Sequence, residues 1–140
     1  MIVREPLESL VSEYNRQAQG HTGHARDMRQ LNSFISNKVR TWRKMNLDWL
    51  ENFSPQQLLV VSYSQLVTDL RSQLKRMATF LNVTVTENDL NCTLQRREGS
   101  FKRKKVYQKL NIDLHNKKLV EEYKTDVLNA AIKVYSNFVF

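Results

Sequence analysis

The segment that most constrains the fold is the N-terminal run Ile2–Tyr14, which changes from a strand pattern to a helix pattern around Arg4. Pro6 suits the first turn of a helix, because the N–H that it lacks would have no partner there. Apolar side chains then recur at helical spacing and predict one apolar face: Leu7, Leu10, Val11 and Tyr14. Arg4 therefore stands between a strand end and a helix N-terminus, where α/β folds bind anions. Ser12 lies two turns further on, with a hydroxyl that could reach the same anion. On these residues alone, a solvated arginine beside a structural turn is the simpler interpretation.

Length, composition and net charge limit the possible functions but do not identify one. A length of 140 residues predicts a single domain over residues 1–140, and an apolar fraction of 41% is enough for a core. The net charge of +8 indicates an anionic partner: nucleic acid, a phosphorylated cofactor, an acidic glycan or a membrane surface. One cysteine excludes an internal disulfide framework, and three scattered histidines predict no metal site.

The chain shows no run of membrane-spanning length, and its first residues do not resemble a signal peptide. Met1–Val3 already looks like the inside of a strand. We therefore expect the sequence to begin part-way through a larger unit.

A second strand–helix unit is predicted over residues 58–81. The run Leu58–Tyr63 is short, apolar and bounded by turn residues, as in a parallel strand covered on both faces. Ser64 is a plausible N-cap for a helix whose apolar stripe continues to Leu81. Further helices are predicted over three segments: Leu31–Phe53, Thr86–Leu94 (opened by a capping box of Thr86 and Asp89) and Leu119–Tyr135. The pattern predicts an α/β fold that is mostly helical, with about two short parallel strands.

Two loops carry side chains that could contact an anionic ligand. In the loop Gln19–Ala25, His21 and His24 could bind an acidic substrate or transfer a proton, although two surface histidines are the simpler interpretation. The stretch Arg96–Lys105 places six cations around Gly99 and an aromatic residue. Guanidinium groups and backbone N–H groups in such a loop can hold phosphate, but a solvated loop or a nucleic-acid patch has the same composition.

Taken in this order, the motifs resemble the C-terminal part of a sulfotransferase that uses 3'-phosphoadenosine-5'-phosphosulfate, with a partial P-loop-like fold. Arg4 and Ser12 resemble the pair that binds the 3'-phosphate of the donor, and Tyr63 resembles the tyrosine beside its adenosine. Arg96–Lys102 resembles the loop that closes over that phosphate. The resemblance implies these donor-binding residues: Arg4, Ser12, Tyr63, Arg96, Arg97, Gly99 and Lys102.

The chain is most similar to the WSC domain-containing sulfotransferases of the Golgi, which act on glycans and are linked to sialic acid sulfation. Four segments in the family's order carry this resemblance: Glu13–Arg16, His21–Ala25, Asp48–Leu50 and Gly99–Arg103. It implies a membrane-anchored enzyme of the Golgi lumen whose partners are a nucleotide donor and a glycan acceptor, with no nucleic acid. His21 and His24 are then candidates for contact with an acidic sugar.

The chain also departs from the family pattern. Ser64 and Gln65 replace the acidic pair usual after the tyrosine, and Glu98 stands in the basic loop. The family's phosphosulfate-binding loop and catalytic base are expected N-terminal to Arg4, outside this sequence. Three interpretations stay open: a truncated sulfotransferase carrying the 3'-phosphate-binding half of the site, a non-catalytic remnant that binds adenosine 3',5'-bisphosphate or a partner, and a basic helical module for nucleic acid.

Three N-x-S/T triplets occur, beginning at Asn52, Asn82 and Asn91. Such triplets arise by chance, and Pro55 weakens the first. Three in a chain of this length mildly favour a secretory compartment.

Overall fold

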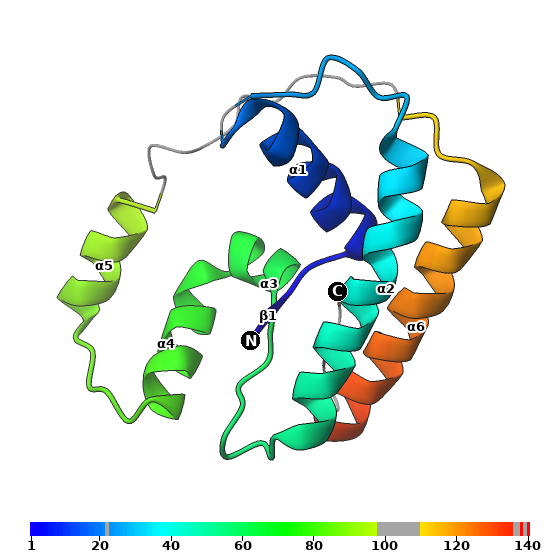
Figure 1. The fold of residues 1–140 in the computed structure, drawn as a ribbon. Helices are drawn as coiled ribbons and strands as arrows, with labels where there is room; N and C mark the ends of the chain where they lie inside the picture. Colours follow the sequence, from blue (N-terminus) through cyan, green and yellow to red (C-terminus); the bar gives the residue numbers. More distant parts are fainter. Residues whose placement is uncertain (22, 98–109, 136–137, 139) are drawn as a thin grey trace.

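The computed structural model describes residues 1–21, 23–97, 110–135, 138 and 140 (Figure 1). This part of the chain contains two strands and six helices: β1 (Ile2–Val3), α1 (Pro6–Gln19), α2 (Leu31–Asn52), β2 (Val61–Ser62), α3 (Tyr63–Thr68), α4 (Leu70–Phe80), α5 (Glu87–Gln95) and α6 (Leu114–Val134). A mostly helical fold with two short parallel strands is thereby confirmed, while its P-loop-like character stays a prediction. None of the helices in the described ranges combines the length and hydropathy that crossing a membrane requires.

The two strands pair in parallel, with Ile2 opposite Val61 and Val3 opposite Ser62. The Val61 N–H donates to the Met1 carbonyl at 2.9 Å as part of the Ile2–Val61 pair, and the Met1 ammonium group donates to the Leu59 carbonyl at 2.6 Å, which extends the contact between the two segments. Only two residues of the predicted strand Leu58–Tyr63 form the ladder, because β1 offers no more partners. This register also decides which residues lie together at the end of the sheet. The residues that follow the last pair, Arg4 and Tyr63, emerge side by side at the carboxyl end of the sheet.

Helices α2 and α6 run side by side in the same direction and form the central helix pair of the fold (Figure 1). The N-terminal halves of both helices enter one apolar cluster and the C-terminal halves enter another: Leu31, Ile35, Val39 and Val120 in the first, and Leu50, Val127 and Ala131 in the second. Polar contacts fix the same register. Asn116, only 1% exposed, donates to the Asn32 carbonyl at 3.1 Å and accepts from the Ser36 hydroxyl at 2.7 Å.

Helix α1 crosses the N-terminal half of α2 and carries its apolar face inward as predicted. Leu10 is buried in the first cluster, and Leu7, Val11 and Tyr14 pack against it. The Tyr14 ring meets Phe34 edge-to-face with ring centroids 5.3 Å apart. This packing leaves the opposite face of α1, which bears Ser12, toward the outside of the core.

The segment after β2 differs from the sequence prediction at two points. The helix cap is Ser62, whose hydroxyl accepts from the Gln65 N–H, and Ser64 already lies inside α3. The single predicted helix is divided into α3 and α4 at Asp69, whose carboxylate accepts from the Ser72 N–H and so caps α4. The predicted capping box of Thr86 and Asp89 is confirmed at the start of α5.

Candidate functional site

The candidate site lies where the chain passes from β1 to α1. Pro6 occupies the first turn of α1, and the Glu5 carboxylate caps the helix by accepting from the Glu8 N–H at 2.8 Å. Arg4 is therefore the last residue before a capped helix, and its side chain is free to extend along the outside of α1. Because Glu5 already satisfies an N-terminal N–H, an anion here would be bound mainly by side chains.

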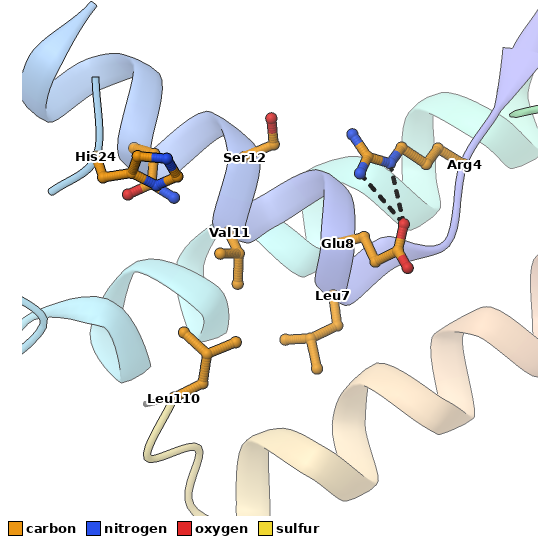
Figure 2. A pocket seen from close by; sticks show the side chains of 8 residues that line it. Arg4, Leu7, Glu8, Val11, Ser12, His24 and Leu110 are labelled. Atoms are coloured by element: carbon orange, nitrogen blue, oxygen red, sulfur yellow. Dashed lines mark hydrogen bonds and ion pairs between the residues drawn. The ribbon is translucent and has the colours of Figure 1, made fainter. Parts of the chain in front are cut away.

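Arg4 has two partners. Its guanidinium carbon lies 4.5 Å from the centre of the Tyr63 ring, the contact that the parallel register makes available. Its Nε and one Nη contact the Glu8 carboxylate at 3.3 and 3.2 Å (Figure 2). The side chains of Arg4 and Glu8 are 33% and 62% exposed, so solvent weakens this ion pair.

Two pockets meet at Arg4. The first, here called the Ser12 pocket, has a volume of about 330 Å³ and is lined by Arg4, Leu7, Glu8, Val11, Ser12, Asn15, His24 and Leu110. The second, the Tyr63 pocket, has a volume of about 430 Å³ and is lined by Arg4, Glu5, Glu8, Tyr63, Ser64, Val67, Thr68, Lys124 and Phe140. A ligand anchored on Arg4 can therefore extend toward the serine of α1 or toward the aromatic ring after β2.

His24 reaches the Ser12 pocket because the loop after α1 folds back on the helix. Asn15 is 3% exposed, and its Oδ1 accepts from the Ala25 N–H at 2.7 Å, which ties the loop to α1. Figure 2 shows Ser12 between His24 and Arg4 along one side of the helix. His21, by contrast, is exposed in the turn that follows α1 and lines neither pocket.

Two other predicted ligands, Arg96 and Arg97, lie apart from this group. Arg96 is the C-cap of α5, and both Arg96 and Arg97 are exposed and line neither pocket at Arg4. Gly99 and Lys102 lie outside the described residues. Of the predicted donor-binding set, Arg4, Ser12 and Tyr63 are thus brought together, and the role of the basic loop stays a prediction.

Three charged residues of the site were not singled out from the sequence. Glu5 and Glu8 place two carboxylates beside Arg4, and the spacing of Arg4 and Glu8 by four residues was the available signal. Lys124 of α6 reaches the Tyr63 pocket, with its Nζ 3.5 Å from Glu121. No local sequence pattern indicates Lys124, because only the packing of α6 places it at the Tyr63 pocket.

The arrangement suits binding of an anion. Guanidinium, hydroxyl and ammonium donors face the two pockets, together with an aromatic ring. Among the described residues, no three His, Cys, Asp or Glu side chains are placed to hold a metal ion.

Comparisons with known proteins show what the chain is similar to. Residues 1–132 match the family model described as the sulfotransferase domain. A WSCD family member of Drosophila melanogaster is 36% identical over 112 residues, and one of Drosophila pseudoobscura pseudoobscura is 38% identical over the same length. A WSCD family member of Aedes aegypti is 36% identical over 112 residues. Each match covers 75% of this chain and 35% of the relative, so the chain matches about a third of the length of these relatives. No solved structure matches significantly.

Proposed function

The chain belongs to the sulfotransferase domain family, and from this we propose that it binds the nucleotide end of 3'-phosphoadenosine-5'-phosphosulfate for sulfuryl transfer to a glycan hydroxyl. The observation that carries the proposal is the position of Arg4, which lies over Tyr63 at the carboxyl end of two parallel strands and shares a pocket with Ser12. In this proposal the chain supplies the half of the donor site that holds the 3'-phosphate.

The Ser12 pocket offers the donors that a phosphate dianion requires. A guanidinium carries five N–H donors, so the contacts of Arg4 to Glu8 leave capacity for a second anion. The Ser12 hydroxyl adds another donor on the same side of α1 (Figure 2). A phosphate dianion carries more charge and more acceptor oxygens than the Glu8 carboxylate. The phosphate is therefore expected to displace Glu8 from Arg4.

The Tyr63 pocket suits the adenosine. The Tyr63 ring is 37% exposed and lines a pocket whose volume lies within the range of small-molecule sites. An adenine ring can stack on an aromatic side chain, as bases do in single-strand binding sites. Arg4 lies over the same tyrosine, so one residue would join the phosphate and the nucleoside parts of the donor.

Binding of this remote phosphate would serve the transfer by positioning. Sulfuryl transfer, like phosphoryl transfer, requires an aligned nucleophile and leaving group with charge stabilised on the transferred group. Contacts far from the reacting centre can hold the donor in line. We assign this positioning role to Arg4 and Ser12, and His24 beside Ser12 is better placed for the donor than for the acceptor.

The acceptor and the compartment follow from the family resemblance. We propose a glycan hydroxyl, with sialic acid as the first acceptor to test, and a membrane-anchored location in the Golgi lumen. Similarity to WSCD family members and the three N-x-S/T triplets support this part of the proposal. His21, exposed after α1, is the remaining histidine candidate for contact with an acidic sugar.

Calorimetry with adenosine 3',5'-bisphosphate and adenosine 5'-monophosphate tests the donor site. The wild-type chain should bind the bisphosphate more tightly, and Arg4→Ala should weaken that binding roughly 10- to 150-fold, the equivalent of one charge-assisted contact. It should weaken binding of the monophosphate much less, because the monophosphate lacks the 3'-phosphate that Arg4 is proposed to hold. Arg29→Ala is the matched control, because Arg29 is 89% exposed, pairs with Asp27 and lines neither pocket.

The outcomes separate the interpretations. Equal binding of the two nucleotides by a folded wild-type chain would refute the 3'-phosphate site. Tighter binding of a single-stranded oligonucleotide than of the bisphosphate would favour the nucleic-acid module. Transfer of labelled sulfate to a sialylated glycan tests the enzymatic part, and bisphosphate binding without transfer would favour the non-catalytic interpretation.

A further inference from the structure

The turn between α4 and α5 carries an N-x-S/T triplet, Asn82-Val83-Thr84, that takes no part in the donor site. Asn82 follows the C-cap of α4 and has a φ of 53°, in the left-handed region. Its N–H donates to the Thr79 carbonyl at 3.1 Å, and the Val83 N–H donates to the Ala78 carbonyl at 2.9 Å. These two bonds form a Schellman motif, which accepts glycine or asparagine at this position. The motif fixes the backbone of Asn82 at the exposed end of a helix.

The other two triplets are engaged in helical structure. The Asn52 Nδ2, which is the atom that would carry a sugar, donates to the Asp48 carbonyl at 2.7 Å. Asn91 lies within α5, where its side chain accepts from Arg71. The Thr93 hydroxyl of that triplet donates to the Asp89 carbonyl at 2.9 Å. Only the triplet at Asn82 lies wholly outside the helices.

The same turn exposes three apolar side chains. Leu81, Val83 and Val85 are 66%, 54% and 38% exposed. Alternating apolar residues in an exposed segment favour pairing with another chain. A hydrophilic group attached to Asn82 would lie among these three side chains and shield them from other molecules.

We propose that Asn82 carries an N-linked glycan that covers the apolar turn Leu81–Val85. The co-reactant is a lipid pyrophosphate-linked oligosaccharide of the secretory pathway. The Asn82 Nδ2 forms a bond to the anomeric carbon of the sugar, the bond from that carbon to the pyrophosphate oxygen breaks, and the lipid pyrophosphate leaves with the electron pair. The amide gives up one proton, and nothing is oxidised or reduced. The proposal rests on the secretory compartment proposed above and does not depend on the donor site.

Mass spectrometry of the chain secreted from insect cells behind an added signal peptide tests the site directly. Peptide N-glycosidase converts a glycan-bearing asparagine to aspartate, and trypsin releases one peptide, Met77–Arg96, that contains both Asn82 and Asn91. The fragment spectra should place aspartate at position 82 and asparagine at position 91. Asparagine at position 82, or conversion at position 91 alone, would overturn the proposal.

Variants separate the glycan from the helix end that Asn82 also forms. Thr84→Ala should lose the glycosidase-sensitive gel shift, whereas Thr84→Ser should keep it. Asn82→Gly should lose the shift while retaining the α4 terminus, because glycine is favoured at that φ. Asn91→Gln, the matched control, should keep the shift. Thr84→Ala should also give less soluble protein than Thr84→Ser, and equal soluble yields would overturn the covering role.

Discussion

Replacing Glu8 by glutamine tests whether the carboxylate beside Arg4 opposes binding of the donor. In the ligand-free chain Glu8 holds Arg4 through contacts of 3.2 and 3.3 Å to one carboxylate oxygen. Both side chains are partly solvated, so the pair itself contributes about 0–1 kcal/mol. A phosphate dianion bound to Arg4 would also lie near the Glu8 charge, and in water that repulsion adds about 1 kcal/mol. Together these terms predict a gain of about 1–2 kcal/mol on neutralising Glu8, or roughly 5- to 30-fold tighter binding.

The assay is calorimetry with adenosine 3',5'-bisphosphate, and Glu13→Gln is the matched control. Glu13 also lies on α1 and its loss changes the net charge equally, but it pairs with Arg16 and lines neither pocket. Glu8→Gln should tighten binding and Glu13→Gln should not. The gain should be smaller in the Arg4→Ala background, because the part that comes from releasing Arg4 is lost while the repulsion between Glu8 and the phosphate remains. An equal gain from both glutamine variants would show a general charge effect and refute the reasoning.

Two further predictions concern stability. Asn116→Ala should lower the free energy of unfolding in urea by about 1–3 kcal/mol, because it empties a buried position and leaves partly buried partners on α2 without their hydrogen bonds. Asn129→Ala, at an exposed position on the same helix, should have little effect. Arg16 holds the pKa of Glu13 down, from 4.5 to about 2, chiefly by hydrogen bonding. The stabilisation from this depressed pKa is present above the unfolded value and is lost as the pH falls from about 4.5 through about 2. Urea titrations at about pH 5 to pH 2 measure the free energy of unfolding over this range. It should fall less steeply with decreasing pH for Glu13→Gln than for the wild type, and an identical slope would contradict the assignment.

The meeting of Arg4 and Tyr63 could be predicted because parallel strands place their carboxyl ends together. Each residue directly follows a short apolar run, and the register of Val3 with Ser62 then leaves them adjacent. The break between α3 and α4 was missed for the opposite reason. An apolar stripe continues from residue 66 to residue 81, and periodicity alone hides the cap that Asp69 provides.

The far wall of the Tyr63 pocket could not be predicted from local patterns. Lys124 and Phe140 line it only because α6 packs parallel to α2. That register depends on contacts between distant residues, such as the Arg43 Nε and the Asp126 carboxylate at 2.6 Å. Both residues look like ordinary surface charges in the sequence. The same holds for Asn15, whose buried side chain brings His24 to Ser12 through the backbone of Ala25.

Tyr63 and Glu8, the two partners of Arg4, have opposite effects on its affinity for a phosphate. Contact with the Tyr63 ring restricts the guanidinium before a phosphate arrives, and a restricted side chain loses less entropy on binding. Glu8 instead occupies donors that the phosphate would use and adds repulsion. Removing the ring should therefore weaken binding even though Arg4 keeps all its N–H donors, while removing the carboxylate should strengthen it even though Arg4 becomes less fixed. Affinity for the 3'-phosphate then depends on the balance between a tyrosine placed by the sheet and a carboxylate placed by the first turns of α1.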